Sequence, residues 1–147
     1  MIPSELNLLV WRGTTFEIEL VSQVKNFIFD PVVHNSPADL KRTHAENLEY
    51  YGFTYDYLNF ASVYNSADLV VMPPWRQKGD ENRAPLLSLT VAAGGIQFTS
   101  TSVKVGISAE ATQLIDFDSG TYKLLLHTTD GKTDGLIYGD FDVKGER

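Results

Sequence analysis

The paired glycines Gly94 and Gly95 are the first residues whose type and spacing could do chemistry. Backbone amides in a glycine-rich loop can cradle a phosphate when a helix begins directly after the glycines. The next residues, Ile96 to Phe98, are instead typical of a strand, and no Gly-Lys-Ser or Gly-Lys-Thr follows directly. We therefore predict that the glycine pair is a turn between two strands and binds no nucleotide.

The histidines His34, His44 and His127 are the next candidates, because imidazole binds metals. A helical zinc site needs two histidines four residues apart, whereas the first two are ten apart. The run that starts at Asp116 opens like a calcium loop. Its sixth and twelfth positions, however, are Thr121 and His127 instead of Gly and Glu. The sequence therefore predicts neither a metal nor a cofactor.

Two carboxylates, Glu17 and Glu19, could act as an acid and base pair in glycoside hydrolysis. They lie two residues apart in an alternating stretch, where both would point outward as the ordinary polar face of a half-buried strand. No serine-centred nucleophile elbow occurs either. We therefore expect no catalytic residues, and we expect that the protein is not an enzyme.

A run of aromatic residues gives the strongest indication of a binding surface. Tyrosine-rich segments with little charge are typical of interfaces, since their rings provide contact area at low rotamer cost. The alternatives are packing over the protein's own fold and stacking on sugar rings. The candidate interface residues are Leu40, His44, Leu48, Tyr50, Tyr51, Phe53, Tyr55, Tyr57 and Phe60.

Composition restricts the class of protein further. The chain has 147 residues, which suits one domain, and it contains no cysteine for a disulfide or thiolate site. The net charge of −7 disfavours nucleic acid as a partner. The amino terminus lacks the features of a signal peptide, and the apolar runs are too short for a membrane span. We expect a soluble protein without a membrane anchor.

Alternation of apolar and polar residues predicts most of the secondary structure. Phe16, Ile18 and Leu20 would face one way while the glutamates between them face the other. Gly13 provides a tight connection before this strand, and Asp130-Gly131 predicts a hairpin. The other predicted strands are residues 6–11, 68–72, 86–91, 96–98, 102–107, 121–127, 136–138 and 140–143, with a polar loop at 77–83.

Two segments break this pattern. Residues 108–114 predict a short helix that Ser108 caps. Residues 30–65 predict an insertion with its own helix, which Ser36 caps and Gly52 ends, followed by an aromatic arm. Short strands with frequent turns favour an all-β fold, mainly an antiparallel β-sandwich, Ig-like in style. We expect residues 1–147 to form one such domain carrying the insertion.

The order of these segments resembles a family of small β-sandwich virion proteins of tailed bacteriophages, similar to the amino-terminal domain of baseplate upper proteins. The match covers residues 6–21 and about 66–145. Thr14 stands where the family usually has Asp, and the insertion has no counterpart. The matching segments are Arg12-Gly13-Thr14-Thr15-Phe16, Leu89-Thr90 with Gly94-Gly95-Ile96, Ile107-Ser108-Ala109-Glu110-Ala111-Thr112, Gly120-Thr121-Tyr122, Asp130-Gly131, and Tyr138-Gly139-Asp140-Phe141-Asp142-Val143.

The resemblance implies a virion structural protein of the tail, baseplate or neck that connects other virion proteins such as fibres. Its expected partners are those proteins and copies of itself in a symmetric ring, and its expected location is the virion after synthesis in the host cytoplasm. One alternative is a carbohydrate-binding module that uses the aromatic arm, Trp11 or Trp75 as a platform for sugars. Another is a capsid decoration protein.

Overall fold

The computed structural model describes residues 3–74 and 84–147 of the chain. The fold divides into two compact units. We call Met1–Leu20 together with Asn59–Arg147 the body, and Val21–Leu58 the insert. The insert thus starts and ends earlier in the sequence than the predicted insertion at 30–65. The loop predicted at residues 77–83 lies outside the described residues.

Two sheets make up the described part of the body. The larger, six-stranded sheet has the order β1-β11-β10-β6-β7, with β2 also on β11. β1 and β2 run parallel to β11, and the other neighbouring strands are antiparallel. The strands are β1 Ser4–Glu5, β2 Leu8–Trp11, β6 Tyr64–Met72, β7 Leu87–Thr90, β10 Ser119–Thr128 and β11 Thr133–Lys144.

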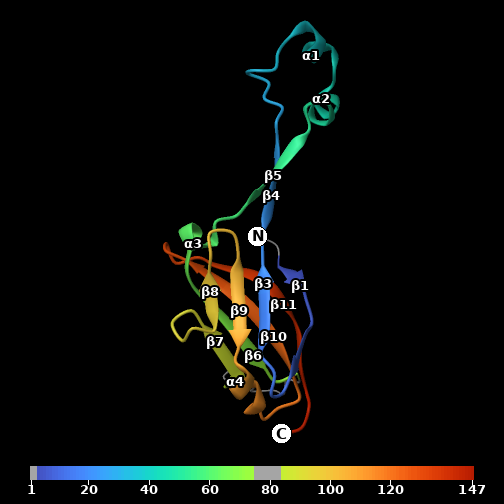
Figure 1. The fold of residues 1–147 in the computed structure, drawn as a ribbon. Coiled ribbons are helices and arrows are strands. Elements are labelled where there is room, and N and C mark those ends of the chain that lie inside the picture. The colour runs from blue at the N-terminus through green and yellow to red at the C-terminus, as the bar shows by residue number, and fades with distance from the viewer. Residues whose placement is uncertain (1–2, 75–83) are drawn as a thin grey trace, which may run out of the picture. The chain divides into compact units, whose positions relative to one another are not determined.

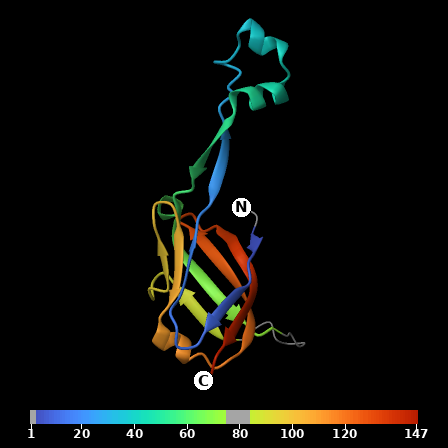
Figure 2. The same ribbon diagram turned by 45° about the vertical axis from the view of Figure 1, so that its right-hand side comes forward.

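The smaller sheet has three antiparallel strands in the order β3-β9-β8. It lies over one face of the larger sheet (Figures 1 and 2). The mainly antiparallel β fold is thereby confirmed, while the Ig-like sandwich class stays a prediction. The remaining body elements are β3 Phe16–Leu20, β8 Ile96–Phe98, β9 Val103–Ile107, α3 Phe60–Val63 and α4 Ala109–Gln113.

The body core forms where alternating side chains of both sheets point inward. Tyr122, Leu124 and Leu126 of β10 are buried, and Val103 and Val105 of β9 have no exposed surface. Burying one such aliphatic side chain contributes about 1.5–3 kcal/mol. The predicted alternation along β3 is confirmed too, since its two glutamates are exposed and its apolar residues are half-buried. The apolar pattern therefore determines which face of each strand is buried.

Turns and caps follow local sequence signals. Gly13 has φ +79° and closes a turn in which the Thr14 amide donates to the Trp11 carbonyl at 3.2 Å. This turn carries the chain from the larger sheet to the smaller one. Gly131, with φ +91°, lies in the predicted hairpin between β10 and β11. Ser108 caps α4 by accepting from the Ala111 amide at 3.1 Å, as predicted.

Arg12 has a structural role that its sequence position does not reveal. Its side chain is 2% exposed, and its guanidinium donates to three backbone carbonyl oxygens. The acceptors are Ile115 at 3.0 Å, Phe117 at 2.7 Å and Gly145 at 2.7 Å. It also pairs with the exposed carboxylate of Asp118 at 3.0 Å. Arg12 therefore joins the segment after α4 to the end of the chain.

The insert consists of a two-stranded antiparallel ribbon and two short helices. The ribbon strands are β4 Gln23–Phe27 and β5 Phe53–Tyr57. The helices are α1 Pro37–Lys41 and α2 His44–Tyr51, where the sequence predicts one helix. Arg42 is extended, and Thr43 starts α2 with its own capping box, which separates the two helices. In the described part of the chain, no helix is long and apolar enough to cross a membrane.

Two buried tyrosines give the body a predictable response to alkali. Burial raises the pKa of Tyr122 to about 12. Burial and a hydrogen bond to Asp134 raise the pKa of Tyr64 to about 12 as well. An unfolded tyrosine ionises near pH 10. The stability that these groups provide is therefore complete below about pH 10 and is lost as the pH rises toward 12.

Ultraviolet absorbance of tyrosinate during a pH titration measures this effect. We expect the folded chain to show a late phase that Tyr64→Phe and Tyr122→Phe each reduce. The same chain in denaturant should titrate in one transition near pH 10. A folded chain whose seven tyrosines all titrate with the unfolded chain would contradict the assigned burial.

Candidate functional site

The Gly94-Gly95 pair is a turn between strands, as predicted. The Gly94 amide donates to the Val91 carbonyl and the Gly95 amide to the Thr90 carbonyl, both at 3.1 Å. Strand β8 begins at the next residue. Both amides are therefore used within the turn, and no helix follows to present further donors to a phosphate. Gly131-Lys132-Thr133 matches the Gly-Lys-Thr end of the phosphate-binding loop motif. It likewise lies in the β10–β11 hairpin and leads into a strand.

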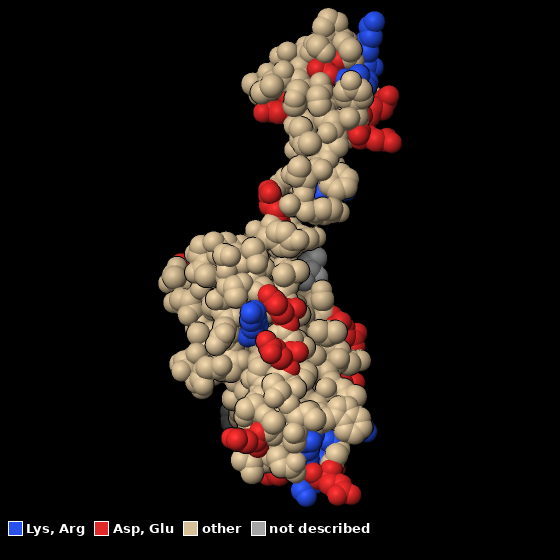
Figure 3. Space-filling view, in the orientation of Figure 1, with Lys and Arg blue, Asp and Glu red and all other residues tan. Residues whose placement is uncertain are grey.

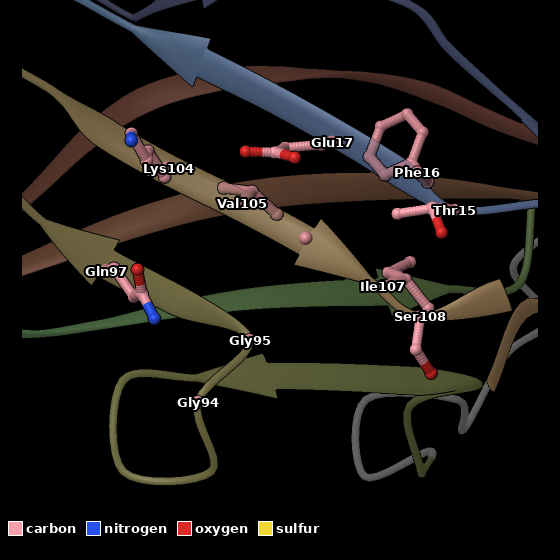
Figure 4. Close-up of a pocket in the computed structure, with 11 residues that line it drawn as sticks. Thr15, Phe16, Glu17, Gly94, Gly95, Gln97, Lys104, Val105, Ile107 and Ser108 are labelled. Carbon is pink, nitrogen blue, oxygen red and sulfur yellow. The ribbon is translucent and has the colours of Figure 1, made fainter. Parts of the chain in front are cut away.

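A shallow hollow of about 280 Å³ lies beside this turn. Glu17, Gln97 and Lys104 line it from β3, β8 and β9 (Figure 4). Lys104 is the register partner of Glu19, so opposite charges meet across the outer face of this sheet. Such cross-strand pairs stabilise a sheet by a few tenths of a kcal/mol to about 1 kcal/mol. We interpret the hollow as part of the solvent-facing surface of the small sheet.

His127 takes part in a hydrogen-bonded chain across three strands of the larger sheet. Its Nε2 lies 2.7 Å from an oxygen of Asp68 on β6, and its Nδ1 lies 3.0 Å from the Thr133 hydroxyl on β11. A carboxylate, an imidazole and a hydroxyl in this order also occur in hydrolases. Here the amides of the neighbouring turn bond within the turn, for example Lys132 to the Thr128 hydroxyl, so they are not aimed at a developing oxyanion.

The other two histidines pack as aromatic rings in the insert. His34 stacks on Tyr51 with ring centres 4.0 Å apart, and its Nδ1 accepts from the Asp30 amide at 2.9 Å. His44 lies edge-on to Phe29 at 5.7 Å. Within residues 3–74 and 84–147, no group of three or more His, Asp or Glu side chains is placed to hold a metal ion.

The aromatic residues of the ribbon share one face. In the β4–β5 register, Phe27 pairs with Phe53, Lys25 with Tyr55, and Gln23 with Tyr57. The alternate pairs, Val24 with Asp56 and Asn26 with Thr54, therefore lie on the opposite face. We call the face that carries Phe27, Phe53, Tyr55 and Tyr57 the aromatic face. Figure 3 shows mostly uncharged surface on the visible side of this ribbon.

This aromatic face is open to solvent and has internal order. Tyr55 and Tyr57 are each 54% exposed. The Phe53 ring lies edge-on to both Phe27 and Tyr55, with centre distances of 6.2 Å and 5.2 Å. The Lys25 ammonium lies 3.9 Å from the centre of the Phe53 ring. Such cation–π contacts contribute about 0.5–1 kcal/mol at exposed sites. The rings thus form an ordered apolar surface with one cation in its centre.

The ribbon lacks the packing that usually stabilises strands. Every residue of β4 and β5 is exposed, and within the described residues each strand pairs only with the other. A two-stranded ribbon of this kind is marginal in water, and its free edges can pair with another chain. Contiguous exposed apolar side chains typically mark sites of protein interaction. The ribbon is therefore the strongest candidate for a functional surface in the described chain.

A network around Asp39 holds the two helices of the insert together. The buried Asp39 carboxylate accepts from the Tyr51 hydroxyl at 2.7 Å and from the Arg42 guanidinium. Asn47 accepts from Arg42 at 2.8 Å and donates to the Asp39 carbonyl at 3.0 Å. The Tyr51 hydrogen bond is the main reason that the pKa of Asp39 is lowered below 3.8, and the same contact raises the pKa of Tyr51.

Asp39→Asn is expected to loosen α1 and α2 while the body stays unchanged, because the amide loses the charge that Arg42 and Tyr51 contact. In the parent chain the same loosening should appear as the pH falls below 3.8, since a lowered pKa stabilises only while the group is ionised. Amide hydrogen exchange of the insert measures both effects. The control is Glu49→Gln, which removes the same negative charge from an exposed residue of α2. Unchanged protection in Asp39→Asn would contradict this role.

The structure separates the predicted interface residues into four groups. Phe53, Tyr55 and Tyr57 lie on the aromatic face, whereas Leu40, His44 and Tyr50 are exposed on the helices. Leu48 and Tyr51 are half-buried within the insert. The inclusion of Phe60 was wrong, because this side chain is fully buried in the body, where it lies 6.2 Å from the Tyr64 ring.

Sequence reasoning missed Phe27 and Lys25, which complete the aromatic face from β4. The only available signal was a single Phe in an otherwise mixed segment. It also missed the Asp68–His127–Thr133 chain, whose members are distant in sequence. A scan of protein-family models finds no match to this chain, and no curated protein matches its sequence.

Proposed function

We propose that this protein is a non-enzymatic structural component of a bacteriophage virion, in the tail, baseplate or neck, and that the aromatic face of its insert contacts a neighbouring virion protein. The main support for this contact is that four aromatic side chains are exposed on one face of an otherwise unpacked ribbon. Burying such rings contributes strongly to the free energy of association, since each ring buries about 150–250 Å² of surface.

The virion assignment rests on the order of the body segments. The basic-Gly-Thr turn before β3, the Gly-Gly turn before β8, the Ser-capped α4 and the Asp-Gly hairpin occur in the order seen in the small virion proteins that the chain resembles. We infer accordingly that the two sheets of the body form an Ig-like β-sandwich. In this view the body is the anchoring domain, and the insert is an addition that makes a contact particular to this chain.

Ring geometry favours a protein partner over a sugar. A sugar platform needs rings that present a flat surface, whereas the planes of Phe27 and Phe53 meet at 74° and those of Phe53 and Tyr55 at 76°. Trp11, which is 54% exposed at the end of β2, favours a carbohydrate-binding module. Trp75 lies outside the described residues. A glycan array with the purified chain tests that second function.

Quantitative mass spectrometry of purified phage particles from the source tests the first function. About six or twelve copies per particle are expected for a symmetric tail or neck ring. Hundreds of copies would instead indicate capsid decoration. The absence of the chain from particles would overturn the virion proposal.

A further inference from the structure

The outer face of the larger body sheet has two adjoining apolar hollows. One, of about 450 Å³, is lined by residues that include Val70, Met72, Leu125 and Tyr138. The other, of about 250 Å³, shares Leu125 and Tyr138 with the first and extends to Gly135. A cavity of about 150 Å³ accepts a benzene ring. The two hollows are therefore large enough for at least one aromatic side chain each.

Gly135 lines the smaller hollow. Its φ is not in the left-handed region, so the backbone does not require glycine at this position. A Cβ built there would lie 3.4 Å from the Pro3 ring and 4.0 Å from Leu125. A glycine opposite Leu125 on the sheet thus leaves space between apolar side chains. Aromatic rings commonly cover glycines in this way across a sheet.

Charge around the hollows complements the aromatic face of the insert. The larger hollow is flanked by Glu5, Asp140 and Lys123, which together carry a charge of −1. The aromatic face carries one charge, that of Lys25, and two tyrosine hydroxyls that can bond to these polar groups. Apolar rings around a single cation would therefore meet an apolar surface with an acidic margin.

We infer that the aromatic face of one copy of this chain docks into these two hollows on the body of a second copy. Phe53 and Tyr55, whose ring centres are 5.2 Å apart, supply rings to the adjoining hollows. The two surfaces belong to different parts of the chain, so the contact either closes reciprocally between two copies or repeats head-to-tail as a ring or a filament. This inference rests on the proposed function and names the partner of the ribbon as the same protein.

Sedimentation velocity of the purified full-length chain over a concentration series tests the inference. Tyr55→Ala and Gly135→Leu should each weaken association about 30-fold, the first by removing a ring and the second by filling its hollow. Lys25→Glu should weaken it up to about 5-fold, as for an exposed ion pair. Adding Glu5→Lys to Lys25→Glu should restore association. Lys41→Glu, with the same change of charge on α1, should leave association unchanged.

Each outcome either supports or overturns the proposed contact between copies. Circular dichroism first confirms that Gly135→Leu is folded, and the charge exchange provides a second test if it is not. A chain that is monomeric at every concentration overturns the inference. It is also overturned by association that Tyr55→Ala weakens while Gly135→Leu leaves it unchanged and Glu5→Lys, added to Lys25→Glu, does not restore it. Neither result affects the proposed function, because incorporation into particles is measured separately.

Discussion

Arg12→Ala is expected to lower the free energy of unfolding of the body by about 3 kcal/mol. The variant leaves the carbonyl oxygens of Ile115, Phe117 and Gly145 without the donor that the guanidinium supplies. An unsatisfied buried polar group costs about 1–3 kcal/mol, and the three costs are not fully additive because the end of the chain can relax. Urea unfolding followed by tryptophan fluorescence measures the loss.

Two variants control this measurement. Arg12→Lys keeps the charge but cannot reach three carbonyls in one plane, so a loss of about 2 kcal/mol is expected. Arg147→Ala removes the other, exposed partner of Asp118 and should change stability by less than about 0.5 kcal/mol. If Arg12→Ala and Arg147→Ala were equally stable, the assigned role of the buried guanidinium would be wrong.

A pH dependence follows from the same cluster. The hydrogen bond from Arg12, followed by that from Arg147, holds the pKa of Asp118 below its usual 3.8. The stability that this carboxylate provides is therefore present above 3.8 and is lost as the pH falls below that value. Acid unfolding of Arg12→Ala should show less of this dependence than the parent chain does.

Replacing the insert with a short turn is expected to leave the body folded while abolishing its contact with neighbouring chains. The Leu58 amide donates to the Ser22 carbonyl at 2.8 Å, so the chain enters and leaves the insert at one hydrogen-bonded pair. An Asn-Gly turn in place of residues 23–57 can close this gap as a two-residue hairpin. The free energy of unfolding should change by less than about 1 kcal/mol, because the body core contains no insert residue.

Heat and urea unfolding of the turn variant, compared with the parent, measure this independence. One cooperative transition with native-like tryptophan fluorescence is expected. A variant that fails to fold would mean that the insert is needed for folding of the body. The assembly of an unfolded turn variant would not test the ribbon contact. The single substitution Tyr55→Ala would then replace the turn variant in the assembly measurement.

Strands with one buried face could be predicted from the sequence, because burial imposes the alternation that reveals them. Phe16, Ile18 and Leu20 illustrate this, as do the capping residues Ser36 and Ser108, whose local hydrogen bonds form as expected. Strand β4 could not be found in this way. Both of its faces are exposed, so Gln23 to Phe27 carries no alternating pattern, and the predicted insertion began too late.

Only part of the candidate site could be predicted from the sequence, for a related reason. Aromatic density located Phe53, Tyr55 and Tyr57, but only the strand register brings Phe27 and Lys25 onto the same face. Phe60 was included because it is near these residues in sequence. Asn59, which caps α3 by accepting from the Ser62 amide, marks the point where the chain returns to the body. An asparagine cap of this kind is a local sequence signal for the start of a helix.

Incorporation of the turn variant into phage particles tests whether the aromatic ribbon is an assembly contact. Particles are produced with the parent or the variant chain as the only copy, purified, and quantified by mass spectrometry against another virion protein. We expect the parent chain to be present in a fixed number per particle and the folded variant to be missing or strongly depleted. Equal incorporation of the two chains would contradict the assignment of the aromatic ribbon as an assembly contact.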